Sequence, residues 1–320
     1  MKKIIEIVPN YSEGIRKEVM DEIISPFMNV ENIFLVRLEM DASYNRSVLT
    51  VIGEASIVLD KMVESAKLAT KLIDLTKHKG EHFRMGAVDV TPILPIQNIT
   101  EDECIDLSRD LGRRMNEATN VPVFLYSKSA TRPHTENLPD IREGEFEGMR
   151  DKLKDPKWYP DFGNNAPHPT AGVYAVGCRN PLVAFNIDVD SNNKNQVSGI
   201  ARRVRYSGGG YRYIQAGAVH LSDRDIYQVT MNLTDFSKTA MYQAIEAVRM
   251  EAKRFNIEIL NTEIVGLVSR VCLEDSLKYY LKMPANKKLD LSLEELTELS
   301  IKHFKLRDFS IEKIIEYYIN

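Results

Sequence analysis

The chain has few of the features that mark secreted, membrane or nucleic-acid-binding proteins. Its three cysteines, among 320 residues, are widely spaced and form no CxxC pair, which indicates neither a disulfide framework nor a zinc site. Glu6 and Pro9 interrupt the apolar start too early for a secretory signal, and no segment is a membrane-span candidate. The net charge of −4 leaves no basic footprint. We therefore expect a cytoplasmic protein without a membrane or nucleic-acid partner.

The composition is that of a soluble globular protein with room for about two domains. Hydrophobic residues make up 43% of the chain and charged residues 28%. No cluster of histidines and carboxylates has the spacing of metal ligands, so we expect no metal. Cys178 lies beside Gly177 and Arg179, but a small buried cysteine is a better interpretation than a thiol nucleophile.

The first part of the chain alternates between strand and helix patterns. Short apolar runs predict strands at residues 4–8, 33–38, 48–52 and 87–95. Helix signals cover residues 12–26 and 59–73, the second with apolar residues at three- and four-residue steps. The resulting order, βαββαβ, is that of the ferredoxin-like unit, a four-stranded antiparallel sheet with both helices on one face.

This order places three connections at one end of the sheet, at residues 9–14, 41–46 and 78–84. They would bring together polar residues that are far apart in the sequence, namely Asn10, Asp41, Asn45, Arg46, His82 and Arg84. A lone loop histidine is weak evidence of a site. With these neighbours, a site around His82 becomes the better hypothesis. His78 is interpreted as a residue at a helix end.

The pattern restarts in the second half. A helix at residues 100–119, a strand at 121–126 and a helix at 142–153 come first. Strands are then predicted at residues 182–187, 213–221, 227–233 and 257–268, with helices at 196–206 and 240–255 and a helical final segment. We predict the α+β class, with two duplicated ferredoxin-like subdomains, residues 1–180 and 181–320, that face each other across a substrate cleft.

The segment between the halves, residues 158–172, is rich in proline and glycine and contains the only tryptophan, Trp158. Regular structure is therefore not expected there. A flexible linker would be polar and featureless, so a structured binding loop is the favoured interpretation.

Several motifs together resemble a known family. They include Gly80-Glu81-His82 and stand, in order and at compatible spacing, at residues 8–14, 45–46, 80–87, 141–147, 160–163, 182–187, 228–236, 264–268 and 314–317. The set closely resembles the formiminotransferase domain of formiminotransferase-cyclodeaminase. That family has two ferredoxin-like subdomains and moves the formimino group of N-formimino-L-glutamate to N5 of tetrahydrofolate, giving 5-formimino-tetrahydrofolate and L-glutamate, a step of histidine degradation. The sequence stops without a cyclodeaminase domain, so we expect a stand-alone transferase whose product goes to a separate formimidoyltetrahydrofolate cyclodeaminase.

The resemblance also implies a site. It places the catalytic base at His82, whose imidazole could take a proton from the attacking nitrogen and give one to the leaving glutamate. We expect Asp41 to orient the imidazole or stabilise the amidinium, and Arg84 to bind a carboxylate at two points. Asn10, Asn45, Arg46 and Asn186 are expected to contact substrate. The folate is expected against Gly163, Asn164, Asn165, Ala166, Pro167, His168, Pro169, Thr170, Ala171 and Gly172.

Alternatives remain at this stage. The donor could be formyl rather than formimino, from N-formylglutamate or 5-formyltetrahydrofolate, because the two groups differ only by O for NH. A non-catalytic folate-binding module is a hypothesis of another class. Arg202, Arg203, Arg205 and Arg212 could attract a polyglutamate tail, although a solvated helix face is the better interpretation. Related domains suggest a homodimer.

Overall fold

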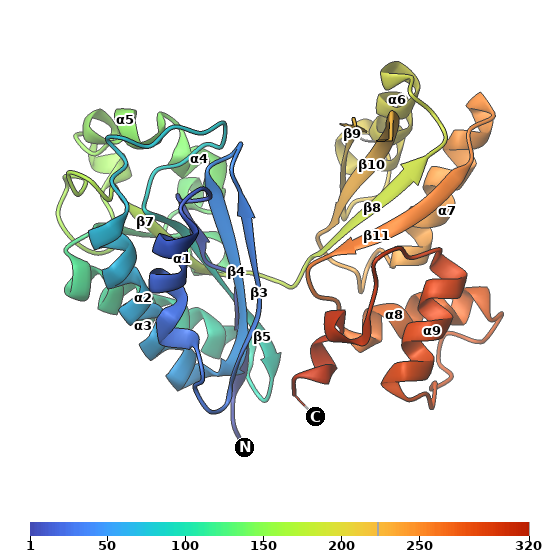
Figure 1. The fold of residues 1–320 in the computed structure, drawn as a ribbon, viewed down its shortest axis with the longest axis horizontal. Helices are drawn as coiled ribbons and strands as arrows, with labels where there is room; N and C mark the ends of the chain where they lie inside the picture. The colour runs from blue at the N-terminus through green and yellow to red at the C-terminus, as the bar shows by residue number, and fades with distance from the viewer. Residues whose placement is uncertain (223, 320) are drawn as a thin grey trace. The chain divides into compact units, whose positions relative to one another are not determined.

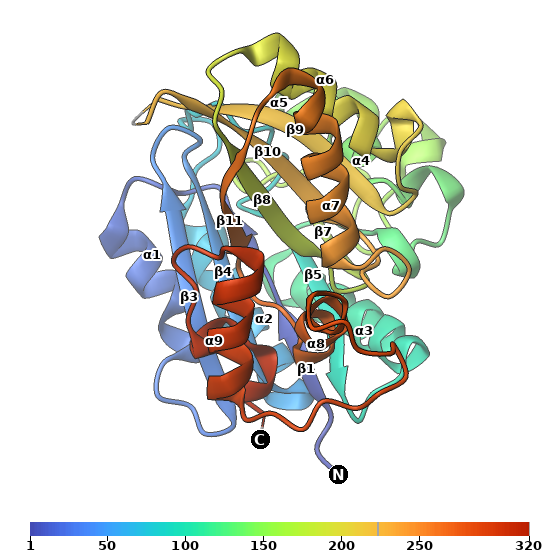
Figure 2. The same ribbon diagram turned by 90° about the vertical axis from the view of Figure 1, so that its right-hand side faces the viewer.

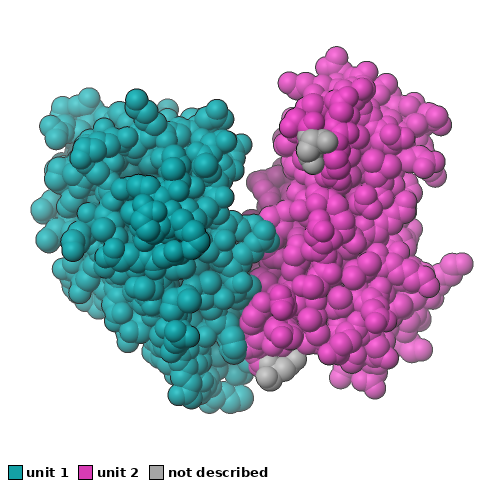
Figure 3. All heavy atoms as spheres, in the orientation of Figure 1, with its two compact units in different colours: residues 1–179 teal, residues 180–320 magenta. Residues whose placement is uncertain are grey.

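The computed structural model describes residues 1–222 and 224–319. Its contacts divide the chain into two compact units, Met1–Arg179 and Asn180–Asn320 (Figure 3). Each unit has its own hydrophobic core. Among the described residues, no helix is both long and apolar enough to cross a membrane.

The first unit is built on a mixed seven-stranded sheet. Its strands are β1 (Ile4–Ile7), β2 (Asn10–Tyr11), β3 (Ile33–Asp41), β4 (Arg46–Glu54), β5 (Val88–Gln97), β6 (Val123–Leu125) and β7 (Tyr174–Cys178). β1 and β2 both lie between β4 and β5, with antiparallel pairing on each side. β3 pairs with β4, while β5, β7 and β6 run parallel to one another. The sheet therefore contains the expected four strands, and β7 and β6 extend it beyond β5.

Helices cover both faces of this sheet. They are α1 (Lys17–Ile24), α2 (Ala55–Leu72), α3 (Glu101–Thr119), α4 (Leu138–Arg142) and α5 (Glu145–Lys152). Figure 1 shows α1, α2 and α3 together on one side, where Met62 and Leu111 pack with Val51. On the other face, Ile141 of α4 and Met149 of α5 pack against Phe124 in a smaller cluster. α4 thus lies over the face that carries the side chains described below.

Three details of the first unit differ from the sequence prediction. The sequence patterns predict no element at β7, because its five residues are all buried and show no alternation between apolar and polar. The first helix begins at Lys17 rather than at Ser12, since the carboxylate of Glu13 accepts hydrogen bonds from the backbone of Ile15 and Arg16 and holds a turn. The sheet is mixed rather than purely antiparallel.

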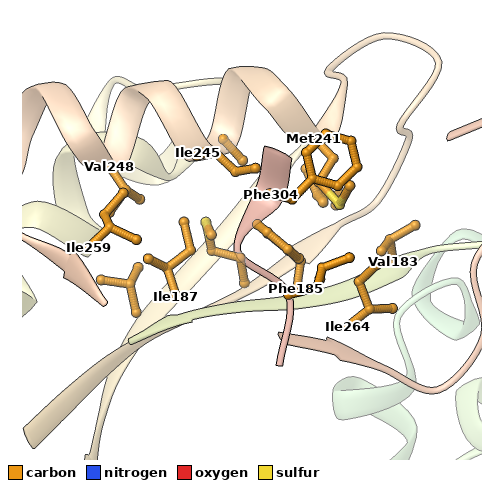
Figure 4. Packing of buried hydrophobic residues seen from close by; sticks show 14 of the residues in the cluster. Val183, Phe185, Ile187, Met241, Ile245, Val248, Ile259, Ile264 and Phe304 are labelled. Carbon is orange, nitrogen blue, oxygen red and sulfur yellow. The ribbon is translucent and has the colours of Figure 1, made fainter. Parts of the chain in front are cut away.

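The second unit has a four-stranded antiparallel sheet in the order β11-β8-β10-β9. Its elements are β8 (Val183–Val189), α6 (Lys194–Val204), β9 (Ile214–Leu221), β10 (Ile226–Leu233), α7 (Met241–Ala252), β11 (Ile259–Val265), α8 (Arg270–Tyr280) and α9 (Leu293–Phe304). Figure 2 shows α7 lying across this sheet. In Figure 4, Phe185 and Ile187 of β8 point toward Ile245 of α7. The predicted α+β class with two sheets is confirmed.

Candidate active site

The three predicted connections of the first unit do meet at one end of the sheet. A Cβ on Gly14 would lie 2.2 Å from the carbonyl oxygen of Asp41, and a Cβ on Gly80 would lie 2.4 Å from that of Tyr44. Only glycine allows the backbones to approach so closely. The connections at residues 9–14, 41–46 and 78–84 are therefore packed directly against one another.

Asn45 ties the three connections together. It has a positive φ of 49°, its Oδ1 accepts from the backbone N of Gly14 at 2.9 Å, and its Nδ2 donates to the carbonyl of Lys79 at 2.9 Å. Asparagine is one of the few residues that adopt this backbone conformation readily. Both atoms of its amide are used within the protein, so these contacts favour a positioning role for Asn45 over the predicted contact with substrate.

His82 lies in this connection cluster beside Arg46. Nη1 of Arg46 contacts Nε2 of the imidazole, so the guanidinium donates and Nε2 accepts. Burial lowers the pKa of His82 below its ordinary value, and the positive charges of Arg46 and Arg142 lower it further, against the opposing effect of Asp89. The imidazole is therefore neutral near pH 7, the state that a general base needs.

Asp89 and Arg142 are site residues that the sequence analysis missed. Asp89 is buried where the pairing of β5 with β2 is irregular, since Asn10 pairs with Val90 and Tyr11 with Val88. Its Oδ2 accepts from Nη2 of Arg142, and its Oδ1 accepts from the backbone N of Met85 at 2.8 Å. A charged residue inside the apolar run 87–95 was the signal that could have found Asp89.

Arg84 has partners other than the predicted substrate carboxylate. Its guanidinium pairs with Glu145 at 3.0 Å and with Glu147 at 2.6 Å, and its Nε donates to Nδ1 of His78 at 3.2 Å. His78 in turn donates from Nε2 to the carbonyl of Asn45 at 2.9 Å. These contacts argue against a carboxylate clamp and for a role in holding the His82 loop. The interpretation of His78 as a helix-end residue is wrong, because α2 ends at Leu72.

Asp41 and Asn10 each have a hydrogen-bond partner within the protein, and their predicted roles toward the substrate stay predictions. Oδ1 of Asp41 accepts from the backbone N of Tyr44 at 2.9 Å, and the carboxylate acts electrostatically on Arg46. No hydrogen bond joins Asp41 to His82 in residues 1–222 and 224–319. Asn10 is buried, and its Nδ2 donates to the carbonyl of Val8 at 2.8 Å. In this structure the imidazole is oriented by Arg46 rather than by Asp41.

A cavity of about 510 Å³ opens over β3 and β4 beside this cluster. Its lining includes Arg37, Glu39, Asp41, Tyr44 and Arg46. The Tyr44 ring is edge-on to the His82 imidazole, with ring centroids 6.1 Å apart. The cavity thus joins both signs of charge with an aromatic surface, which suits a small ligand that carries cationic and anionic groups.

The loop of residues 163–172 ends against the same region. His168 and Gly172 form two backbone hydrogen bonds, of 2.9 and 3.0 Å, and Nδ1 of His168 accepts from the N of Ala171 at 3.0 Å. The carbonyl of Ala171 accepts from the N of Ala87 at 3.0 Å. Gly163, Asn164, Asn165 and Ala166 are exposed. The end of the loop is therefore an ordered turn bound to the strand that follows His82, and its start is accessible.

Asn186 belongs to the second unit, where its Nδ2 donates to Oε2 of Glu263 at 3.3 Å. The same sheet face has a buried carboxylate, Asp188, which is paired with Arg224 at 2.7 Å and with Arg307 at 3.1 Å. A contact of Asn186 with folate stays a prediction. In the part of the chain that the structure describes, no group of three or more His, Cys, Asp or Glu residues could hold a metal ion.

Comparison with known proteins identifies the family. Residues 4–179 match the model of the formiminotransferase domain, N-terminal subdomain, and residues 184–320 match that of the formiminotransferase domain. The chain belongs to the formiminotransferase family. It is 43% identical to a glutamate formimidoyltransferase of Streptococcus pyogenes serotype M1 over 88% of this chain and 95% of the relative.

Two further relatives agree. A glutamate formimidoyltransferase of Thermoplasma acidophilum is 37% identical over 88% of this chain and 93% of its own length. A formimidoyltransferase-cyclodeaminase of Rattus norvegicus is 36% identical over all of this chain but only 60% of its own length. The formiminotransferase family is thus established along both units.

Proposed function

We propose that this protein is a glutamate formimidoyltransferase, which moves the formimino group of N-formimino-L-glutamate to N5 of tetrahydrofolate. One observation supports this most directly: the match to a glutamate formimidoyltransferase covers 95% of that relative. The half-buried imidazole of His82, with its lowered pKa, supplies the proton acceptor that such a transfer requires.

The reaction needs two proton movements at one carbon. N5 of tetrahydrofolate attacks the amidine carbon and forms a tetrahedral centre bonded to three nitrogens. His82 takes the proton that N5 loses. The bond from carbon to the glutamate nitrogen then breaks, and the imidazolium returns its proton to that nitrogen. A single imidazole serves as base and then as acid, so no net proton is left on the enzyme.

The position of the folate is part of the proposal. We infer that both units are ferredoxin-like and that the pterin binds against residues 163–172. The exposed start of that loop, at Gly163 to Ala166, supports this inference because its backbone and amides are free to meet a flat ring. A substrate cleft between the units and a contact of folate with Asn186 stay predictions. Five further points stay predictions: a polyglutamate tail on the folate, a homodimer, a cytoplasmic location, a reaction without a metal, and a separate cyclodeaminase that takes the product.

The deciding test is an assay of the purified chain with tetrahydrofolate and either N-formimino-L-glutamate or N-formyl-L-glutamate. We expect release of L-glutamate from the formimino donor at a kcat/KM at least tenfold above that of the formyl donor. A preference for formyl would replace the donor assignment but keep the fold and site. Folate binding without turnover of either donor would favour the non-catalytic module.

A further inference from the structure

Two guanidinium groups act on His82, and they differ in how firmly they are held. Arg142 is paired with the buried carboxylate of Asp89. Arg46 has no ion pair with a carboxylate in residues 1–222 and 224–319, and its contact with the His82 imidazole is its only side-chain hydrogen bond there. Its Nε is buried and has no partner. Arg142 is thus fixed by an ion pair with Asp89, whereas Arg46 is fixed only by a hydrogen bond to the neutral imidazole of His82.

The contact between Arg46 and His82 occupies the atom that catalysis needs. Nη1 of Arg46 donates to Nε2 of His82, so the lone pair of that nitrogen is already engaged. An imidazole in this state has no free acceptor at Nε2 for the proton of the folate N5. His82 is therefore in the neutral state that a base needs, but its Nε2 is blocked by Arg46.

Arg46 also lines the cavity over β3 and β4. A ligand in this cavity would therefore meet the same guanidinium that covers His82. The donor in the proposed reaction carries two carboxylates, and a carboxylate is a stronger partner for guanidinium than a neutral imidazole, because the hydrogen bonds are charge-assisted and paired. Burial lowers the pKa of Arg46, so its charged form lacks stabilisation that an anion would supply.

We propose that Arg46 exchanges partners during the reaction: it covers Nε2 of His82 in the free enzyme and turns to a carboxylate of the glutamate donor, which uncovers the base. This inference rests on the proposed function, since the ligand is the glutamate part of the donor. Arg142 stays with Asp89, so its positive charge continues to lower the pKa of His82 after Arg46 has turned away. Arg46 is then a positioning residue that makes base release depend on donor binding.

The first test follows His82 in the full chain by NMR while L-glutamate, a product and stable probe, is added. We expect the pKa of His82 to rise on binding, because a cation leaves the ring and an anion arrives nearby. Arg46→Gln should show a higher His82 pKa without ligand and little further rise. Arg37→Gln is the matched control: Arg37 lines the same cavity but is paired with Glu39, and the rise should persist.

The second test separates this role from a purely structural one. Arg46→Gln should raise KM for the formimino donor about 10- to 100-fold, the range of lost charge-assisted bonds, with KM for tetrahydrofolate little changed, and Arg46→Lys should restore part of it. The acid limb of kcat/KM should move to higher pH in Arg46→Gln.

Two outcomes would overturn the exchange. One is an unchanged His82 pKa in the wild-type protein at saturating L-glutamate, or no binding of L-glutamate at all, in an enzyme that transfers the formimino group. The other is an unchanged donor KM in a folded Arg46→Gln protein. Absence of any transfer would instead reject the proposed function.

Discussion

The two units hold buried charge in different ways. In the second unit, Asp188 is fully buried and accepts from two arginines and from Gln228 at 2.8 Å, while Arg307 also pairs with Glu263 at 2.7 Å. In the first unit, Asp89 holds Arg142 in the same manner, but Arg46 beside it is left with an imidazole. We call a network saturated when each of its charged groups is paired with one of opposite charge, as around Asp188, and such a network stabilises the fold. Arg46 has no paired carboxylate, so its guanidinium has N–H donors left for a ligand.

This difference in pairing affects stability, because buried carboxylates and buried guanidinium groups both lose their hydration. A buried ion pair that loses one partner leaves an uncompensated charge and is strongly destabilising. The network around Asp188 avoids this cost by complete pairing. Beside His82, the Nε atoms of Arg46 and Arg142 are buried without partners, and a carboxylate of the proposed donor would offset this cost at Arg46.

The largest expected effect is at the imidazole. His82→Ala should lower kcat by about a hundred- to ten-thousand-fold, the usual contribution of a general acid–base group. Tetrahydrofolate affinity, measured by calorimetry, should change little. As a control, His220→Ala alters an exposed histidine of the second unit that pairs with Asp225, and kcat should be unaffected. A kcat within tenfold of wild type in His82→Ala would show that His82 is not the proton shuttle.

The next effect concerns the saturated network. Asp188→Ala leaves Arg224 and Arg307 without their shared carboxylate, so the free energy of unfolding should fall by about 3 kcal/mol. Urea unfolding measures this change. Asp308→Ala is the matched control, because Asp308 pairs with Arg307 at 3.1 Å but is exposed, and it should matter far less. Equal losses in the two variants would mean that burial does not set the strength of this network.

Arg84 tests whether a paired arginine in the first unit is structural. Arg84→Gln breaks the pairs with Glu145 and Glu147, and we expect a loss of about 1 kcal/mol in unfolding free energy. The donor KM should stay within about threefold of wild type, because the guanidinium is engaged inside the protein. A much larger rise in donor KM without loss of stability would reinstate Arg84 as a carboxylate clamp.

The smallest effect is a pH dependence of stability. Burial is the main cause that lowers the pKa of both His78 and His82 in the folded state. Such groups favour the fold fully above the unfolded pKa near 6.5, and this contribution is lost as pH falls toward the folded pKa, because the unfolded chain takes up protons first. The urea midpoint should therefore drop between pH 7.5 and 5.5. The drop should be smaller in the double variant His78→Gln, His82→Gln, and an equal drop would assign it to other groups.

The loop of residues 163–172 shows how far local sequence can be interpreted. Its prolines and glycines correctly ruled out a helix or a long strand, and its end is an ordered turn through His168 and Gly172. The adjoining strand β7 was missed, because a short strand buried on both faces has neither the alternation nor the length that distinguishes it from other apolar segments. Its pairing with β5 and β6 depends on partners far away in the chain.

The sequence by itself determined the repeated order of strands and helices, and through it the meeting of three connections around His82. Those features follow from local periodicity and from turn residues such as Gly14 and Gly80, which act within a few positions of the chain. The partners of each charge were decided only by the tertiary structure. Arg142 reaches Asp89 across fifty-three positions, and Arg84 reaches Glu147 across sixty-three. Such pairings depend on how α4 and α5 pack on the sheet, and short-range patterns do not encode that geometry.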